Sequence, residues 1–425
     1  MNRARLRAIP IAFAFSMMAI AWPQHAGQAE LNKQLRLARE EGLPLTAADF
    51  NELIPPVKDS ENAALLYEKL PREMPIVPSR LPLDLIFDPN PALPSQAEKL
   101  LSRNKASLAI LDQAVRRPHC RFNRDWSKGF DLIFPEIPAI RNGGRLLILR
   151  GSLEARNGDC VAAVADATAV FTISRHLQEE PVAISQLMGV FFWVTAERAL
   201  GAWWFHDHGQ RLYRKAYLDG LAQYPRFDPR SQESGVTLGL LHLYHQVENG
   251  ETDPYALPGP TDKDNLKTER KNKELRSKSH HSPEEEAGIV RAGREYWRAL
   301  GLTKSERIRA AAKANSDLMQ ALRHDAAMKQ ALIQFGSVDG GPFLDGLENR
   351  EDGYVWGKQE YVALGRALSE TPVPEAIRTQ DLLSPVDGKP LQYKYDGKQI
   401  TITVSAGSGM KARPIELKLP PDSVK

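Results

Sequence analysis

Histidine is the residue type whose spacing in this chain could support metal chemistry. Residues 206–208 read His-Asp-His, and two further histidines, His242 and His245, stand three residues apart. On a helix, imidazoles at positions i and i+3 share one face and can hold one metal ion, and a His-X-His turn can add a ligand. A zinc ion held by His206, His208, His242 and His245 would activate water for hydrolysis.

The same histidines also have an interpretation that needs no metal. No glutamate stands among them in the H-E-x-x-H arrangement of zinc hydrolases. His206 follows two tryptophans at the end of an apolar run, and the dipole of a helix C-terminus favours a histidine there. The sequence therefore leaves two predictions open, which are no cofactor at all and, as the alternative, zinc.

The chain has two cysteines, Cys120 and Cys160. In an exported protein they could form a disulfide, whose loop would stabilise the fold by about 3–4 kcal/mol in the chain-entropy model. Two buried thiols are the other interpretation, because sequence does not show whether the two Cα atoms come within bonding range. The sequence contains few motifs typical of a catalytic nucleophile. Residues Ser102-Arg103-Asn104-Lys105 satisfy the S-x-x-K pattern, but no K-T-G accompanies it. We therefore assign no catalytic residue from the sequence.

The first 29 residues have the layout of a cleaved secretory signal. Three arginines precede residue 8, an apolar core covers residues 9–20, and small-residue cleavage motifs follow at 19–21 and 27–29. An uncleaved membrane anchor is the alternative, although the apolar core is short for a span. We expect a periplasmic or secreted protein without stable membrane insertion after cleavage.

Removal of this signal changes the charge balance. The whole chain has 56 Lys and Arg against 53 Asp and Glu, and residues 1–29 contain three arginines and no acid. The remaining chain therefore has 53 of each sign and is formally neutral. A neutral body has no general electrostatic attraction for nucleic acid or for an anionic membrane, so we expect no nucleic-acid partner.

The stretch from Pro181 to Phe205 is apolar on almost every face. Its most regular stripe at helical spacing consists of Ile184, Leu187, Met188, Phe191 and Val194. A helix that is hydrophobic all round must be surrounded by protein or lipid, and the charge-free part of this run is too short for a membrane span. We therefore expect the buried central helix of a helical domain.

The remaining sequence predicts a mainly α protein, an antiparallel helical bundle or solenoid-like domain with a small C-terminal β-hairpin or three-stranded cap. After the signal peptide, 1–29, we expect five segments. They are short helices and a Pro-rich strap at 30–94, a central helical domain at 95–249, a charged linker at 250–282, a second helical segment packing on the first at 283–370, and a small β module at 371–425. Within the central domain, helices are expected at about 136–156, 160–178 and 181–207.

Local signals mark several helix starts and one turn. Thr46-Ala47-Ala48-Asp49 is a capping-box pattern, and Ser282-Pro283-Glu284-Glu285 combines an N-cap, a proline at the first helical position and a glutamate at the third. Ser95-Gln96-Ala97-Glu98 predicts a long helix to about Arg117. Asp396-Gly397 between alternating apolar runs is a strong hairpin signal.

Two resemblances accompany these patterns. Gly151, Gly158-Asp159, Ala163 and Val164 fall where a tetratricopeptide repeat places its small and apolar residues, although Glu154 and Val170 depart from the repeat and no second copy follows. This region resembles one TPR-like helical hairpin.

The second resemblance covers both ends of the chain. Residues 37–46, 59–64 and 383–393 are similar to segments of uncharacterised exported bacterial helical proteins, and the run Asp387-Gly388-Lys389-Pro390-Leu391-Gln392-Tyr393 resembles the β-end of type II secretion pseudopilins. In pseudopilins the following loop binds calcium, but residues 405–409 contain no carboxylate, so no calcium site is expected here. The resemblance implies a family without an assigned activity.

Together these observations favour an exported, non-catalytic helical interaction or scaffold protein that binds a protein partner. The alternative is a metal-dependent hydrolase of the cell envelope that uses the four histidines. A structural envelope component related to pseudopilins is disfavoured, because its assembly helix should begin directly at the leader.

Overall fold

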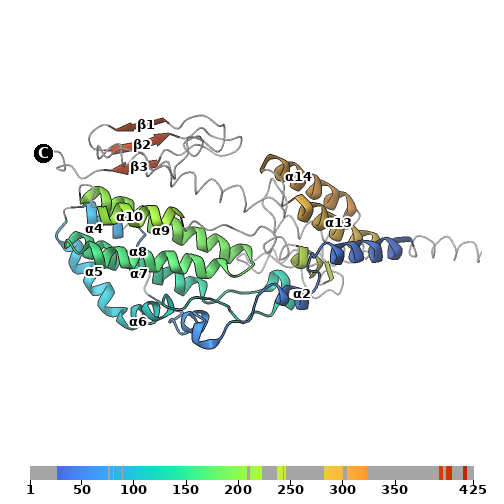
Figure 1. Ribbon diagram of the computed structural model, residues 1–425, viewed down its shortest axis with the longest axis horizontal. Coiled ribbons are helices and arrows are strands. Elements are labelled where there is room, and N and C mark those ends of the chain that lie inside the picture. Colours follow the sequence, from blue (N-terminus) through green and yellow to red (C-terminus); the bar gives the residue numbers. More distant parts are fainter. Residues whose placement is uncertain are drawn as a thin grey trace, which may run out of the picture. The chain divides into compact units, whose positions relative to one another are not determined.

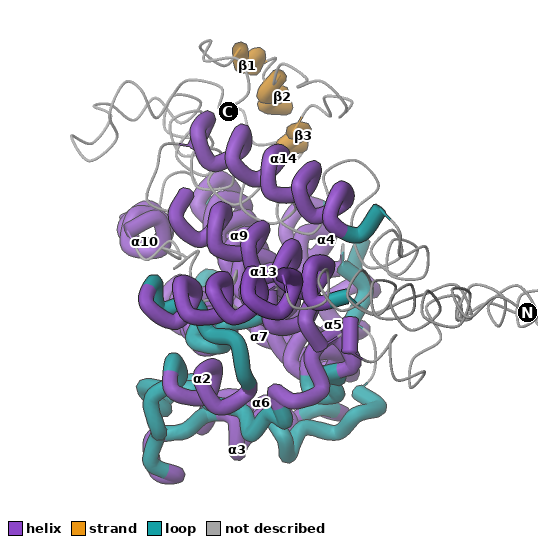
Figure 2. The backbone as a smooth tube through the Cα atoms, turned by 90° about the vertical axis from the view of Figure 1, so that its right-hand side faces the viewer, coloured by secondary structure: helices purple, strands orange, loops and turns teal. Residues whose placement is uncertain are grey.

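The structure is a computed structural model of the 425-residue chain. It describes residues 26–74, 77–79, 81–88, 90–207, 211–222, 237–242, 244–245, 282–299 and 304–323, and the backbone of three strands at 392–395, 399–403 and 415–418. Helix dominates this part of the chain (Figures 1 and 2). The mainly α prediction is confirmed. The predicted signal peptide up to residue 25, the linker at 250–281 and the end of the second helical segment, at 324–370, lie outside the described residues.

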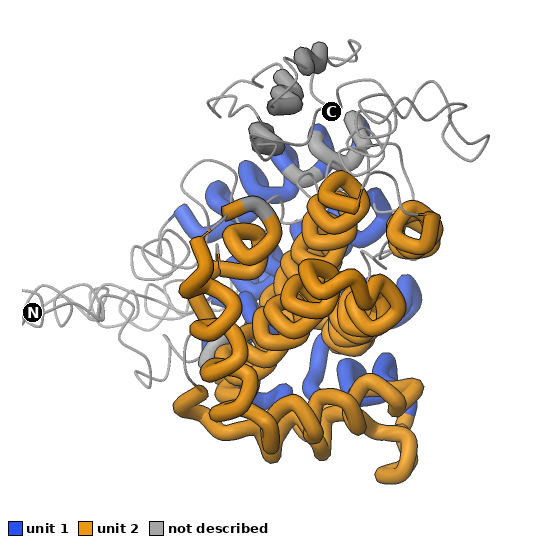
Figure 3. The backbone as a smooth tube through the Cα atoms, turned by 90° about the vertical axis from the view of Figure 1, so that its left-hand side faces the viewer, with its two compact units in different colours: residues 1–55, 124–132, 228–345 blue, residues 56–123, 133–227, 346–425 orange. Residues whose placement is uncertain are grey.

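The chain divides into two compact units (Figure 3). Unit 1 combines residues 1–55, 124–132 and 228–345, and unit 2 combines residues 56–123, 133–227 and 346–425. Each unit is thus assembled from separate stretches of sequence, which differs from the contiguous segments expected.

Unit 2 is built around three consecutive helices, α7 (Ile137–Arg156), α8 (Cys160–Gln178) and α9 (Ala183–His206). These bounds confirm the three helices predicted for this region. Gly158 adopts a φ of 82° in the turn after α7, and the Asp159 carboxylate accepts a hydrogen bond from the Ala162 N–H at 3.0 Å to cap α8. The predicted helical hairpin is therefore present, and its likeness to a TPR remains a prediction.

Helices α7 and α9 run in the same direction. A Cβ placed on Gly144 would collide with the Phe192 ring, and one on Gly151 would lie 2.7 Å from the Trp203 ring. From the first contact to the second, the position moves toward the C-terminus on both helices, from Gly144 to Gly151 on α7 and from Phe192 to Trp203 on α9. This is expected when α8 returns antiparallel between them. The two glycines allow this approach because any side chain there would collide with an aromatic ring.

The buried face of α9 differs from the predicted one. Its most buried apolar residues are Phe192, Trp193, Ala196, Ala199, Leu200, Trp203 and Trp204, each at most 1% exposed. The stripe expected to lead the burial instead contains Ile184 and Leu187, which are 42% and 44% exposed. The expectation that α9 is wrapped on all sides is therefore wrong for its first half.

A charged network ties α8 and α7 to α6 (Lys105–Ala114). The Arg150 guanidinium donates to Asp166 from Nε at 2.9 Å and to Asp112 from Nη2 at 2.9 Å. The two carboxylates raise the pKa of Arg150, against its partial burial. Asp166 is itself buried, so this pairing satisfies a charge that would otherwise be costly inside the protein.

Shorter helices cover this core. They are η1 (Asp59–Glu61), α3 (Ala64–Tyr67), α4 (Leu81–Phe87), α5 (Ala92–Arg103) and α10 (Arg211–Ala222). The Pro-rich stretch expected as an extended strap thus contains α4, whose Leu81 and Leu85 are buried. Pro82 does not prevent this helix, since a proline in the first turn removes no needed donor.

The single helix predicted from Ser95 to Arg117 is also wrong. It is two helices, because Asn104 leaves helical geometry with φ −107° and ψ 17°. Its side-chain amide donates to the Leu100 carbonyl at 2.8 Å, which is the local competition that makes asparagine a poor interior helix residue. Ser95 lies inside α5 and does not cap it.

In unit 1, a helix over residues 26–40 is followed by α2 (Ala47–Glu52), η2 (Trp126–Asp131), helical residues 237–242 and 244–245, α13 (Pro283–Ala299) and α14 (Lys304–Ala321). The predicted capping box of α2 is confirmed, with Thr46 and Asp49 exchanging side-chain and backbone bonds. Ser282 accepts from the Glu285 N–H at 3.2 Å at the predicted start of α13.

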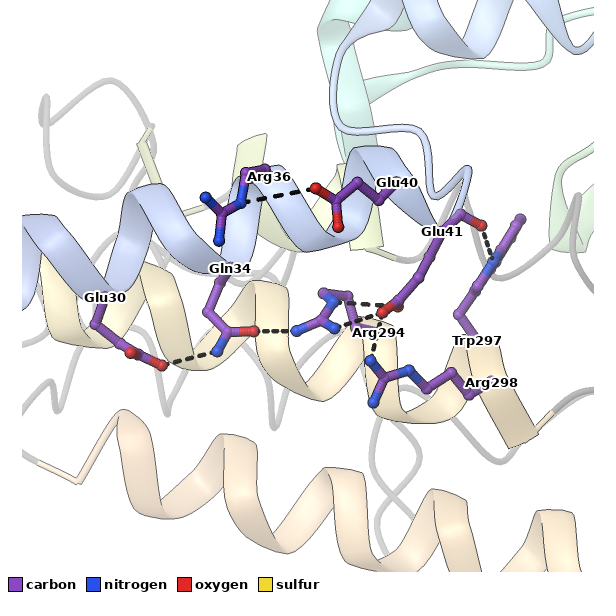
Figure 4. Close-up of polar contacts among 8 residues, drawn as sticks. All are labelled: Glu30, Gln34, Arg36, Glu40, Glu41, Arg294, Trp297 and Arg298. Carbon is purple, nitrogen blue, oxygen red and sulfur yellow. Dashed lines mark hydrogen bonds and ion pairs between the residues drawn. The ribbon is translucent and has the colours of Figure 1, made fainter.

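A polar clamp joins the helix over 26–40 to α13 (Figure 4). The buried Arg294 guanidinium donates to both carboxylate oxygens of Glu41 and to Gln34, and the Trp297 indole donates to the Glu41 carbonyl at 3.0 Å. Arg298 pairs with the same Glu41 carboxylate. Burial opposes ionisation of Glu41, but the two arginines outweigh it and lower the pKa of this carboxyl.

Three short strands lie near the C-terminus: β1 (Gln392–Tyr395), β2 (Gln399–Thr403) and β3 (Ile415–Lys418). They pair antiparallel in the order β1-β2-β3, with Tyr395 opposite Ile400 and Ile402 opposite Ile415. The role of this region as a cap stays a prediction, because the described side chains do not include those of the strands.

Among the described helices, α8 has the length and composition that could cross a membrane. Of its apolar window, 56% is buried inside the structure, and a core helix of a soluble domain meets the same criteria.

Candidate functional site

The structure distributes the predicted histidines over different environments. His206 is in the last turn of α9 in unit 2, whereas His242 and His245 are in unit 1. His208 lies outside the described residues. The described residues contain no group of three or more histidine, cysteine or acidic side chains that could hold a metal ion.

His242 and His245 have different neighbours although they are three residues apart. A Cβ on Gly129 would lie 2.6 Å from His242 Cδ2, so this imidazole packs against the backbone of η2. Its Nε2 atom is buried and forms no hydrogen bond with the described residues. His245 is more exposed, and its Nε2 lies 3.5 Å from a Glu286 carboxylate oxygen. The i, i+3 spacing therefore does not direct the pair to one shared point.

The two cysteines are also held apart. Both are thiols, Cys120 buried and Cys160 partly buried. Cys160 is the first residue of α8, whereas the Cys120 N–H donates to Glu179, just beyond the last residue of α8, at 2.8 Å. A helix of this length separates its ends by about 27 Å, far more than a disulfide spans. The structure does not bring the predicted disulfide pair together.

A buried histidine that the sequence analysis did not single out lies on α8. The His176 side chain on α8 contacts the Tyr67 hydroxyl through Nδ1 and the Arg117 carbonyl through Nε2, both at 2.8 Å. Since a carbonyl only accepts, Nε2 carries the proton and Tyr67 donates to Nδ1. Burial lowers the pKa of His176 from 6.5 to about 4, so the imidazole is neutral near pH 7. The buried His176 side chain therefore links α8 to Tyr67 on α3 and to the backbone at Arg117, and it does not face solvent.

One carboxyl group in unit 2 titrates near neutrality. Burial, and then the adjacent Asp166 carboxylate, raise the pKa of Glu154 to about 7, and its Oε2 atom is buried without a hydrogen bond among the described residues. Such a value suits acid–base chemistry, but structural networks shift pKa values in the same way. Glu154 and Asp166 are next to Arg150 in the network that joins α6, α7 and α8, which accounts for the shift.

The feature that stands out on the described surface is the outer face of α9. Ile184 and Leu187 are exposed, and Met188, Phe191 and Val194 are partly buried against the core. These five residues, which we call the α9 stripe, recur at helical spacing along about 15 Å of helix. The other exposed large apolar side chains described, such as Ile133, Val161 and Met319, are single residues on other elements.

Two arginines of α7 border the α9 stripe. The Arg145 guanidinium carbon lies 5.9 Å from the centre of the Phe191 ring, a cation–π distance. Arg141 is exposed one helical turn earlier. Because α7 and α9 run in the same direction, one turn back along each helix brings Arg141 level with Leu187.

Neither of these arginines has a carboxylate partner among the described residues. The pKa of Arg145 is lowered by burial and then by the like charge of Arg141, with no acidic group offsetting them. Arg150, nine residues after Arg141 on the same helix, is by contrast paired with two aspartates. The α9 stripe and its two arginines therefore form an apolar surface with uncompensated positive charge at its edge.

Sequence reasoning listed the stripe residues but placed them inside the protein. A helix that is apolar on all faces has no amphipathic direction, so its pattern does not say which face points outward. Arg141 and Arg145 were missed. Their signal was available: two arginines one turn apart with no acid within four residues on either side.

Comparison with known proteins adds no relative. The chain matches no protein-family model, no curated protein and no solved structure.

Proposed function

We propose that this chain is an exported, non-catalytic helical protein that binds a protein partner through the outer face of α9. The single observation behind the proposal is the α9 stripe, in which two neighbouring large apolar side chains are more than two-fifths exposed. Grouped apolar residues of this kind are typical of interaction sites, whereas isolated ones are ordinary on any surface.

Export is the second part of the proposal and depends on the first 29 residues, whose charged start, apolar core and small-residue motifs match a secretory signal. We further propose that the mature chain has no stable membrane insertion and that the C-terminal strands form a small cap. The resemblance to uncharacterised exported helical proteins is compatible with an interaction role. The described residues give no specific support to the alternative of a histidine-dependent hydrolase.

Photo-crosslinking inside cells of the natural host tests the interaction. A photoreactive phenylalanine derivative replaces Leu187 in one variant and Val161 in a matched control. Val161 is 68% exposed on α8 and has no apolar stripe around it. We expect a discrete adduct of defined mass from position 187 and none from position 161.

Two results would count against the proposal. An unmodified chain at position 187 after irradiation would mean that nothing covers this face. Equal adduct patterns at both positions would mean that the adducts come from random collision. Fractionation of the same cells checks export, since the chain should be found outside the cytoplasm with a shortened N-terminus.

A further inference from the structure

We infer that the partner at the α9 stripe is an acidic amphipathic helix of another protein, with its apolar side chains on the stripe and its carboxylates opposite Arg141 and Arg145. This inference rests on the proposed function and specifies the chemistry of the partner. It starts from the juxtaposition of five apolar side chains on α9 with two guanidinium groups on α7 that no described carboxylate neutralises.

The shape of the surface favours a helix. Ile184, Leu187, Met188 and Phe191 stand at i, i+3, i+4 and i+7, the spacing at which an amphipathic helix presents its own apolar anchors. A surface that is one helix wide is matched by a partner of similar width. The aromatic ring of Phe191 and the thioether of Met188 are side chains that adapt well to such contacts.

The charge at the edge favours acidic groups on that partner. Arg141 and Arg145 repel each other across one helical turn, and each keeps donors free for a carboxylate. A basic partner would add to this repulsion, so the pair selects against cations as well as for anions. The positions of Arg145 beside Phe191 and of Arg141 level with Leu187 place both charges along one edge of the stripe.

An anionic membrane surface is the other chemistry that could meet apolar and basic side chains together. Lipid-binding segments usually gather about four to eight cations, and this edge offers two. The chain without its signal is also formally neutral. We therefore infer a protein partner, and binding to an anionic membrane is the competing result in the experiment below.

The test measures binding of the purified full chain, without its signal, to two synthetic amphipathic helices. Both carry leucines at i, i+3, i+4 and i+7, and they differ only in having glutamates or lysines beside the leucines. At low salt we expect the glutamate peptide to bind at least roughly tenfold more tightly, with the preference shrinking as salt rises. Vesicles of equal parts phosphatidylglycerol and phosphatidylcholine are tested in parallel.

Two pairs of substitutions test whether a preference for the glutamate peptide comes from Arg141 and Arg145. R141Q/R145Q should bring the two peptide affinities together, whereas K99Q/R103Q, a pair of exposed cations one turn apart on α5, should leave the preference unchanged. Because Arg145 is partly buried, the single variant R141Q, at an exposed position, provides a reading that does not depend on the packing of Phe191.

Three outcomes would overturn the inference: equal affinity for both peptides, a preference that survives R141Q/R145Q, or binding of the anionic vesicles without binding of the glutamate peptide. If position 187 still gives its crosslinked adduct while the charge preference is missing, the proposed function stands and only this inference falls. If the adduct is missing too, both fall.

Discussion

Two helix contacts, one in each unit, are held together by different means. In unit 2, α9 is joined to α7 through the buried rings of Phe192 and Trp203, which lie against Gly144 and Gly151 of α7. In unit 1, the helix over residues 26–40 is joined to α13 through Arg294, Glu41 and Gln34 (Figure 4). Apolar packing tolerates a change of pH or salt but not a change of volume, whereas a charged clamp depends on each partner being present.

Helix α9 matters for function because it has more apolar side chains than the core of unit 2 buries. One face of α9 builds the core of unit 2, and the other face carries the α9 stripe, in which Met188, Phe191 and Val194 are only partly buried against the core and Ile184 and Leu187 are exposed. Unit 1 shows no comparable surplus on its described helices, where Met319 is a single exposed apolar residue of α14.

The largest effect is expected from Trp203→Ala in unit 2. The Trp203 side chain is 0% exposed, its ring lies against Gly151, and its Nε1 donates to Ser152 at 3.1 Å. Removing a buried tryptophan typically costs about 3–5 kcal/mol. Urea unfolding, with peptide-level hydrogen exchange to separate the two units, measures the cost. A loss below about 1 kcal/mol would contradict the packing described for α7 and α9.

The next effect is a pH dependence of unit 2 through His176. The folded pKa, about 4, is below the unfolded value of 6.5, so the unfolded chain takes up the proton first. Stability from this group is complete above pH 6.5 and is lost as the pH falls through 4. The full loss is about 3–4 kcal/mol, since each pKa unit corresponds to about 1.4 kcal/mol.

The variant His176→Gln isolates this contribution because glutamine does not titrate. We expect the unfolding free energy of the variant to fall less steeply than that of the wild type between pH 6.5 and 4. Parallel profiles for the two proteins would show that His176 is not buried in its neutral form.

A smaller, local effect is expected from Arg294→Gln in unit 1. This change leaves Glu41 and Gln34 without their main partner and should cost about 2–3 kcal/mol. Hydrogen exchange should speed up in the helix over residues 26–40, with the amides of α7 to α9 as internal reference. Arg291→Gln is the control, because Arg291 lies on α13 like Arg294. It removes only an exposed ion pair with Glu30 and should cost less than about 1 kcal/mol. Equal effects of the two substitutions would refute the clamp.

Sequence reasoning succeeded where the signal is local. Thr46 and Ser282 begin helices as predicted, and Gly158 and Asp159 end one helix and begin the next, because each acts on backbone groups within four residues. It failed where the outcome depends on distant neighbours. Helix α4, for example, forms within a stretch whose prolines suggested extended chain, and its buried Leu81 and Leu85 pack in the core. The break at Asn104 is a local signal that was overlooked.

Which face of α9 points outward could not be predicted from the sequence, for the same reason. Leu187 and Trp193 are both large hydrophobic residues, and the contacts of Trp193 with Phe171 on α8 and with the Gly220 carbonyl on α10 decide that Trp193 faces in while Leu187 is exposed. The histidine pattern led elsewhere because i, i+3 spacing fixes a shared face but not the distance to a further ligand. The His242 imidazole packs against Gly129, whereas the His245 imidazole lies beside the Glu286 carboxylate.

The most direct test of the central claim uses the double substitution I184S/L187S. If the outer face of α9 serves a partner and not the core, this variant should lose about 1 kcal/mol or less per site in unfolding free energy, because both side chains are already exposed. It should also lose the adduct formed by a photoreactive residue at position 191. A variant that unfolds like Trp203→Ala, or one that keeps the adduct in full, would contradict the account.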